Sequence, residues 1–492
     1  MPRPVRQSLV LACICACTVL VVGFVAAINL AVPKLAASGL DPSSSQLLWI
    51  VDAYVVLFAC LVIPAGALGD RYGRKGVLLA GLTVFAVGAV VSALAANVPV
   101  MLAGRAVTGI GAAGVLPNGL AVLVHATVPR RRPHAIAVWA AMSGVGGVIG
   151  NVGGGALLSI GSWRWLFAAV APVAALCAVW VARTAPRSER HQRALDPVSA
   201  LLLTLATLAL LVGIIQGPEQ GWGSVVVVAA FAVSAALFTT WVLGALRAPE
   251  PLLDPRLFRI PALRAACLGM LVVFFGMFGL FFLNASLLQY GRGFGVLQAG
   301  LGIVPLTVPL LVGARRVPAL VARIGQPAVL AAAFVVTAAG LWGLATAIDD
   351  PYAVYALWLV VIGGGITLAL PSLTIAISAA LPREQAGVAG GLQATTRELG
   401  SALGVAVVGT LLTAQFVHHL SGRVGGRVPH TVAAALATDP GRHPAVIGSY
   451  TAAAGTALKI VSVIVLVAGA AVVVETVWAA RRARRRHPDA PA

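Results

Sequence analysis

The chain has 492 residues, of which 60% are hydrophobic and only 10% are charged, and its formal net charge is +19. Soluble domains carry nearer a quarter of charged residues, so a chain of this length has too few charges to cover two or three soluble domains. The apolar excess must therefore face lipid, and the positive charge, which lies in short breaks between apolar runs, sets membrane orientation rather than binding nucleic acid.

The apolar residues form runs that are long enough to cross a bilayer, since a spanning helix needs roughly twenty of them. The first run follows Arg3 and Arg6. It is too long for a signal peptide and another run follows at once, so we predict a spanning helix. We predict an all-α integral membrane protein with fourteen transmembrane helices, near residues 8–32, 46–68, 76–96, 98–123, 134–159, 163–182, 197–216, 224–246, 263–290, 298–320, 327–347, 353–379, 387–415 and 453–478.

Arginine and lysine alternate between rich and poor connections along this series, as expected if most of them stay on the cytoplasmic side. The outer connections hold few: Lys34, Arg164, Arg292, Arg423, Arg427 and Arg442. This alternation predicts an even number of helices with both termini in the cytoplasm. Arg315 and Arg316 interrupt the inner end of the run 298–320, and we expect their side chains to reach the headgroups.

A short internal repeat indicates two related halves. Residues 66–73 close the second predicted helix and residues 318–325 close the tenth, with Gly73 matching Gly325. Two related halves around a central site are the plan of secondary transporters. We divide the chain into a first six-helix half (1–182), two inserted helices (197–246), a second six-helix half (263–478) and a basic cytoplasmic tail (479–492) that we expect to lie against anionic lipid.

Neither the cysteines nor the histidines predict a metal site. All six cysteines lie inside apolar runs, and the i, i+2 spacing of Cys13, Cys15 and Cys17 spreads them around a helix. Buried structural thiols are therefore favoured over metal ligands or disulfides. Four histidines in the predicted outer loop 416–452 are interpreted as part of a solvated loop rather than as a metal-binding or pH-sensitive cluster: His418, His419, His430 and His443.

Asp52 stands out among the acidic residues. Nearly all of the fifteen acids fall in loops or at helix ends, whereas Asp52 lies roughly 9 Å into the second predicted helix, and Arg105 lies at a similar depth in the fourth. An ionisable group inside the membrane costs about 2.5–3.5 kcal/mol at mid-helix, so it is a functional candidate by default. We predict that the two residues share one polar cavity, pair when no substrate is bound, and couple transport to protons through Asp52. The alternative is a purely structural ion pair.

Two glycine-containing segments are candidates for conformational change. In the inner turn after the second helix, Asp70 can pair with arginine or cap a helix N-terminus and so hold one conformation, although a plain basic loop is the alternative. The candidate residues of this turn are Gly66, Asp70, Arg71, Gly73, Arg74 and Lys75. In the fifth helix, small residues permit close approach and sliding, or simply tight packing. The candidate residues there are Gly146, Gly150, Asn151, Gly154 and Gly155.

These segments together resemble the major facilitator superfamily, in its fourteen-helix drug:proton antiporter branch. The resemblance covers nearly the whole chain and rests on Trp49-Ile-Val-Asp-Ala-Tyr54, Gly66–Lys75, Leu102–Gly111 with Arg105, Gly150-Asn-Val-Gly-Gly-Gly155, Trp163–Phe167, Pro251–Phe258, and Ala386–Gly391 with Arg397. The first segment is similar to one carried by exporters of quaternary ammonium compounds. The resemblance implicates Arg105 in proton coupling and Gly150–Gly155 in antiport.

The chain departs from the family pattern at three positions. Phe24 stands where the first helix usually has an acid, Ala26 where it has threonine, and Asn151 where the fifth helix has proline. These departures put a strong preference for divalent cations in doubt. They also leave Asp52 as the main acid of the outer half.

The resemblance implies a secondary active transporter of the plasma (inner) membrane, not an enzyme, which uses the proton gradient and no cofactor to export lipophilic or cationic drugs or antibiotics. We expect a monomer whose partners are the lipid bilayer, a small substrate and protons, with no nucleic acid and no metal. A narrow exporter of one metabolite and a proton symporter of the same fold remain as alternatives, and a non-transporting membrane sensor is a remote one. Candidate cavity residues, each of which could equally bond to a neighbouring helix, are Asn29, Tyr54, Asn118, Asn284, Gln289 and Thr367.

Overall fold

The structure is a computed structural model that describes residues 4–36, 38–42, 44–186, 196–249, 251–381, 386–421 and 443–486. In these ranges fourteen helical segments are long and apolar enough to cross a membrane, which confirms the predicted number. Helices are expected because a bilayer offers backbone groups no water, so each segment must satisfy its own N–H and C=O groups. The long helices are α1 (Pro4–Ala36), α2 (Ser44–Tyr72), α3 (Arg74–Ala93), α4 (Val98–Ala126), α5 (Arg132–Ile160), α6 (Arg164–Thr184), α7 (Pro197–Gln220), α8 (Val225–Arg247), α9 (Pro261–Ser286), α13 (Gln326–Thr346), α14 (Tyr352–Ala380), α15 (Ala386–Ser421) and α17 (His443–Arg486).

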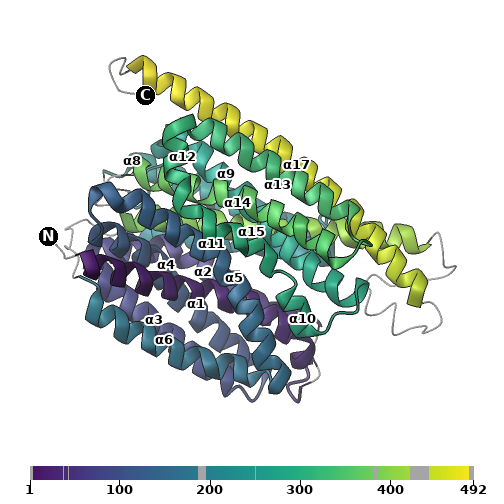
Figure 1. Ribbon diagram of the computed structural model, residues 1–492. Helices are drawn as coiled ribbons and strands as arrows, with labels where there is room; N and C mark the ends of the chain where they lie inside the picture. Colours follow the sequence, from purple (N-terminus) through teal and green to yellow (C-terminus); the bar gives the residue numbers. More distant parts are fainter. Residues whose placement is uncertain are drawn as a thin grey trace.

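The helices form two bundles that pack against each other (Figure 1). In the first bundle α1 packs on α5, and α4 packs on both α2 and α3; in the second, α9 packs on α15 and α13 packs on α14 and α17. The bundles meet where α15 packs on α2 and α4, and where α14 packs on α5. Buried apolar side chains from both bundles form one continuous cluster.

Helices α7 and α8 lie between the two halves in sequence, and α7 also touches both of them. It packs on α8, on α2 of the first half and on α15 of the second. The Thr204 hydroxyl on α7 donates to the carbonyl of Cys60 on α2 at 3.3 Å, and Ser234 on α8 donates to the carbonyl of Ala206 on α7 at 2.9 Å. Helix α7 therefore lies along the boundary between the halves, and α8 packs against α7.

The same glycine turn occurs in both halves. Gly73 separates α2 from α3 with φ 107°, and Gly325 precedes α13 with φ 83°. Only glycine adopts such a conformation without a steric penalty. The predicted internal repeat is therefore present as a shared backbone geometry.

The tenth span is not one continuous helix as the sequence predicted. It runs from Leu297 to Ile324 and consists of short pieces: α10 (Val296–Leu301), the 3₁₀ turn η4 (Val304–Thr307), α11 (Val308–Gly313), the 3₁₀ turn η5 (Ala314–Arg316) and α12 (Val317–Ile324). Pro305, Pro309 and Pro318 lie near the starts of three of these pieces. Each proline lacks an N–H and clashes with a continuing helix, so it breaks the span.

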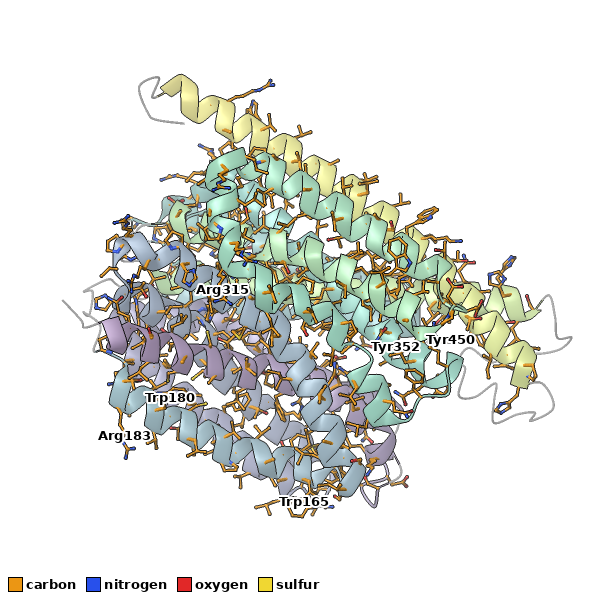
Figure 2. All side chains as sticks on the ribbon, in the orientation of Figure 1. Trp165, Trp180, Arg183, Arg315, Tyr352 and Tyr450 are labelled. Carbon is orange, nitrogen blue, oxygen red and sulfur yellow. The ribbon has the colours of Figure 1, made fainter. Side chains whose placement is uncertain are left out.

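The described ends of the chain lie at the same end of the bundle, because α1 begins and α17 ends there (Figure 1). Arg183 and Arg315 lie toward that end, whereas Trp165, Tyr352 and Tyr450 lie toward the other (Figure 2). The first part of the predicted tail is helical, since α17 continues to Arg486.

The predicted outer loop 416–452 begins and ends in helix. His418 and His419 belong to α15 and His443 begins α17, whereas His430 lies outside the described residues. Among the residues that the structure describes, no group of three or more His, Cys, Asp or Glu side chains is placed to hold a metal ion.

Candidate functional site

Arg105 is a wholly buried cation on α4, and it is held by the backbone of α2. Its Nε donates to the carbonyl of Ile50 at 2.8 Å and its Nη2 donates to the carbonyl of Val51 at 3.1 Å, while the residue is 0% exposed. These carbonyls supply part of the solvation that burial removes. The planar guanidinium suits such two-point contact, so α4 and α2 are joined at this depth.

Asp52 is the next residue of α2 after Ile50 and Val51, whose carbonyls accept from Arg105. Its side chain is partly buried, and its negative charge attracts Arg105. The structure therefore brings together the two residues that the sequence selected. Their shared cavity and the role of Asp52 in proton coupling remain predictions.

Phe24 is part of an aromatic cluster around Arg105. The guanidinium carbon of Arg105 lies 5.0 Å from the ring centroid of Phe24 and 4.8 Å from that of Tyr54, close enough for cation–π attraction. Phe24 also meets Phe85 and Phe167 edge to face, each at 5.6 Å between centroids. Phe24 thus has a physical role of its own, because its ring covers the buried Arg105 guanidinium at the position where the family usually has an acid.

Asp70, at the C-terminal end of α2, joins the two halves of the molecule. Its Oδ1 accepts from Nε of Arg74 at 2.8 Å, and its Oδ2 accepts from the backbone N–H of Val388 at 3.2 Å. Val388 lies in the first turn of α15, where the free N–H groups favour a negative charge. Asp70 therefore makes both contacts that the sequence suggested for it, a pairing with arginine and a contact at a helix N-terminus.

Replacing Asp70 with asparagine is expected to loosen this contact between α2 and α15, because the neutral amide loses the ion pair and the attraction to the helix N-terminus. We expect a loss of about 1–2 kcal/mol, or roughly tenfold in the closed population. The loss of the closed population is measured with Ala389→Cys, at a position that is 3% exposed. The readout is the rate at which this cysteine reacts with a membrane-impermeant thiol reagent. The control is Asp349→Asn on an exposed loop; equal rates in both variants would show that Asp70 does not hold this end closed.

The other residues of the turn after α2 also contact neighbouring parts of the structure. The Lys75 ammonium donates to the carbonyls of Ala182 and Ala185 at the end of α6, at 2.8 and 2.7 Å. The Arg71 guanidinium lies 5.4 Å from the ring centroid of Tyr72. Gly66 lies buried one turn before Asp70. The turn is thus more than a plain basic loop, since its charged residues contact α6 and α15.

The glycines of α5 form a close contact with α1. Gly150 leaves no room for a side chain, because a Cβ there would clash with the backbone of Gly23. A Cβ on Gly146 would lie 3.2 Å from Cα of Val19, and one on Gly154 would lie 2.8 Å from Cβ of Ala27. Small residues allow the two helix backbones to approach closely.

Two further residues of this segment lie toward the tenth span. A Cβ on Gly155 would meet Leu297 at an ordinary 3.7 Å. The backbone carbonyl of Asn151 lies 3.2 Å from the Cβ position of Gly300. The segment therefore contacts α1 on one face and α10 on another, but whether it acts in antiport remains a prediction.

Adding one methyl group at Gly150 is expected to lower the stability of the protein. The same change at Gly153, three residues further along the helix, is expected to have no effect. Gly150→Ala forces the α1 and α5 backbones apart and should cost about 1–3 kcal/mol through overpacking. Gly153 has open space where a Cβ would lie, so Gly153→Ala is the matched control. Thermal unfolding of the purified protein measures both, and equal unfolding temperatures would contradict the close contact.

Three of the six candidate cavity residues make hydrogen bonds between helices. The Asn118 amide on α4 donates to the carbonyl of Ala65 on α2 at 3.1 Å, and Asn284 on α9 accepts from the Tyr355 hydroxyl on α14 at 2.6 Å. Tyr54 does the same, donating to the carbonyl of Val21 on α1 at 3.2 Å. These three residues therefore join neighbouring helices in this conformation, as the structural alternative expected.

The other three candidates bond within their own helix. Asn29 is exposed and donates to the carbonyl of Val25 at 3.4 Å. Gln289 lies in η3 (Leu287–Gly291), a π-helical turn after α9, and donates to the carbonyl of Ala285 at 3.2 Å. The Thr367 hydroxyl donates to the carbonyl of Gly363 at 2.6 Å. Substrate contact by any of the six remains a prediction.

The expectation that Asp52 is the clear exception among the acids is wrong, because Glu398 is more deeply buried. Glu398 is 5% exposed and lies within the span Val388–Ser421 of α15, next to the buried Arg397. Its charge interacts with Arg397 and with Tyr54 across the interface between the halves. The signal was present in the sequence, since Glu398 lies well inside the predicted run 387–415.

A scan against protein-family models matches residues 14–405 to the Major Facilitator Superfamily. The tetracenomycin C resistance and export protein of Streptomyces glaucescens is 32% identical over 76% of this chain and 70% of its own length. The cephamycin export protein CmcT of Amycolatopsis lactamdurans is 33% identical over 81% and 84%. The multidrug resistance protein Stp of Mycobacterium tuberculosis is 31% identical over 82% and 76%.

Solved structures share the architecture. The human organic anion transporter MFSD10 has a TM-score of 0.64 at 17% identity, covering 96% of this chain and 100% of that chain. The proton:xylose symporter XylE has a TM-score of 0.60 at 14% identity, covering 94% and 95%. At these identities the likeness shows the fold alone.

Proposed function

Because the chain belongs to the Major Facilitator Superfamily, it is a membrane transporter and not an enzyme, and we propose that it exports lipophilic or cationic small molecules in exchange for protons. Relatives named for antibiotic export and multidrug resistance support efflux. The observation that carries proton coupling is the position of Asp52, partly buried beside the wholly buried Arg105. A carboxylate in that position can bind a proton from one side of the membrane and release it to the other.

The proposed coupling acts through α2. When Asp52 is charged it attracts Arg105, whose guanidinium already holds the carbonyls of Ile50 and Val51. Protonation removes that attraction and weakens the contact between α2 and α4. The same helix carries Asp70 at its inner end, where it contacts α15. A change at Asp52 can therefore reach the contact between the halves along one continuous helix.

The proposed orientation has both termini in the cytoplasm of a cell whose plasma (inner) membrane holds the protein as a monomer. The described ends of the chain share one end of the bundle, and Arg183 and Arg315 lie toward it (Figure 2). Cytoplasmic loops carry an excess of arginine and lysine, which supports this orientation.

Ethidium movement in proteoliposomes with an imposed pH difference tests the proposed function. The intact protein should move ethidium toward the acidic side, and a protonophore should stop the movement. Ethidium that crosses at the same rate with and without the pH difference would contradict proton-coupled export. Movement of ethidium together with protons would instead indicate a symporter.

A narrow exporter of one metabolite is the second candidate, because two of the relatives are named for a single antibiotic or antibiotic class, tetracenomycin C and cephamycin. This candidate predicts no movement of ethidium under any gradient, together with gradient-dependent movement of one compound. A panel of labelled antibiotics in the same proteoliposomes distinguishes the two.

A further inference from the structure

Arg397 is another buried cation, and it lies at the boundary between the halves. It is 2% exposed and lies in α15, roughly 14 Å along the helix from Val388 at 1.5 Å per residue. Arg397 therefore lies well inside the segment that is long and apolar enough to cross about 30 Å of hydrocarbon. A charge there is expensive and marks a functional site by default.

The contacts of Arg397 cross the boundary between the halves but leave part of the guanidinium unused. Nη1 donates to the hydroxyl of Ser143 on α5 at 3.2 Å, and the guanidinium carbon lies 4.6 Å from the ring centroid of Phe274 on α9. Within the described part of the chain, Nε of Arg397 has no hydrogen-bond partner. Glu398 attracts Arg397, but residues i and i+1 of a helix do not face each other.

Gln393, a buried neighbour of Arg397, also has a polar atom without a partner. Gln393 lies one turn before Arg397 on the same face of α15, is 2% exposed, and donates to the hydroxyl of Thr374 on α14 at 3.0 Å. Its Oε1 has no partner among the described residues. A buried polar group without a partner costs about 1–3 kcal/mol, so the unpaired Nε of Arg397 and Oε1 of Gln393 indicate that a ligand supplies the missing bonds.

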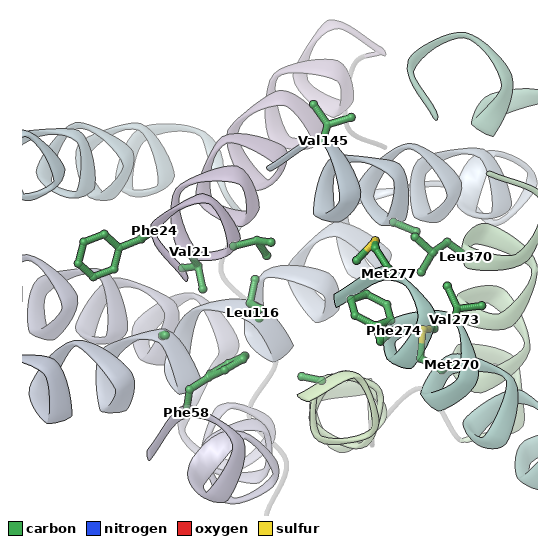
Figure 3. Packing of buried hydrophobic residues seen from close by; sticks show 14 of the residues in the cluster. Val21, Phe24, Phe58, Leu116, Val145, Met270, Val273, Phe274, Met277 and Leu370 are labelled. Atoms are coloured by element: carbon green, nitrogen blue, oxygen red, sulfur yellow. The ribbon is translucent and has the colours of Figure 1, made fainter. Parts of the chain in front are cut away.

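The surroundings of these groups are apolar and adaptable. Met270, Phe274 and Met277 lie together on α9, with Leu370 of α14 beside them (Figure 3). Methionine side chains repack easily around ligands of different shape. A cation with an unpaired N–H beside such a surface suits a molecule with an apolar body and an ionised acidic group, whereas the unpaired acceptor of Gln393 suits a hydroxyl or amide donor of the same molecule.

We propose that Arg397 binds the acidic group of an amphiphilic organic anion at the boundary between the halves. This inference rests on the proposed export function and extends its substrates from lipophilic cations to organic acids. Arg397 belongs to the second half and its partner Ser143 to the first, so rocking of the halves must break their hydrogen bond. That movement frees Nη1 for the ligand, which places the site where alternating access is expected to act.

A matched pair of probes tests the proposal: N-phenyl-1-naphthylamine, which is neutral, and its 8-sulfonate, which is an anion on the same skeleton. The protein is held in lipid nanodiscs, and the rise of its unfolding temperature with probe concentration gives the affinity for each. The intact protein should prefer the sulfonate. Arg397→Gln should weaken sulfonate binding about tenfold or more relative to the neutral probe, and Arg183→Gln, which removes an exposed charge of the same sign, should not.

The ratio of the two affinities decides the result, because a general loss of folding affects both probes alike. The proposal is overturned if Arg397→Gln weakens the binding of both probes equally or of neither. It is also overturned if the intact protein binds neither probe, or if Arg183→Gln removes the preference for the sulfonate as well. Should Arg397→Gln not fold, Arg397→Lys decides: it keeps the charge but loses Nε, so the preference should fall severalfold, and an unchanged preference overturns the proposal. Ethidium export that fails while the Arg397-dependent preference persists would reject the proposed function and leave this site standing.

Discussion

Asp52→Asn is expected to abolish the accumulation of ethidium that a pH difference drives, while ethidium still moves down its own concentration gradient. A pH difference of one unit supplies about 1.4 kcal/mol for each proton exchanged, which sustains up to roughly a tenfold ratio of substrate concentrations. Asparagine resembles the protonated carboxyl in shape but cannot release a proton. The variant should therefore still bind ethidium and let it equilibrate, but it should sustain no ratio.

The measurement is the steady-state ratio of ethidium across proteoliposome membranes, together with the rate of exchange without a gradient. Asp349→Asn is the matched control, because it removes the same charge from an exposed loop between α13 and α14. If Asp52→Asn sustains the same ratio as the intact protein, the coupling carboxylate lies elsewhere. Glu398→Gln is then the next variant, since Glu398 is the acid buried within the span of α15.

The family, the fold class and the number of spans could be predicted from the sequence because the bilayer imposes long apolar segments and short polar breaks. The family match and the fourteen spans confirm these predictions. The break in the tenth span was missed, although Pro305, Pro309 and Pro318 were visible. Hydropathy identifies a membrane span even when it contains prolines. Whether the helix breaks depends on where each proline removes a backbone N–H from the hydrogen-bond pattern.

The candidate site could be predicted only in part, since residue types indicate chemistry but not partners. Asp70 was expected to meet an arginine or a helix N-terminus, and Arg74 lies four residues away in the chain. Its other partner, Val388, is 318 residues away, and no local pattern specifies that pairing. Phe24 likewise looked like the loss of an acid, because its contact with Arg105 on α4 appears only after folding.

Arg105→Gln is expected to destabilise the protein by about 2–4 kcal/mol and to stop gradient-driven transport. The carbonyls of Ile50 and Val51 lose two charged donors, each worth about 1.5–3 kcal/mol, and part of this is offset because no charge remains to be buried. Arg105→Lys keeps the charge near the rings of Phe24 and Tyr54 but cannot form the planar two-point contact. It should lie between Arg105→Gln and the intact protein in unfolding temperature.

A double-mutant cycle separates the structural role of Arg105 from its coupling to Asp52. If the two charges interact, the destabilisation in Asp52→Asn/Arg105→Gln should differ from the sum of the single effects by at least about 0.5 kcal/mol. Arg183→Gln combined with Asp52→Asn should be additive, because Arg183 is exposed in the last turn of α6. Additivity of the Asp52 and Arg105 effects would mean that Arg105 only braces α2 against α4. A proton on Asp52 would then leave that contact unchanged, and the proposed path from Asp52 through α2 to Asp70 would lose its first step.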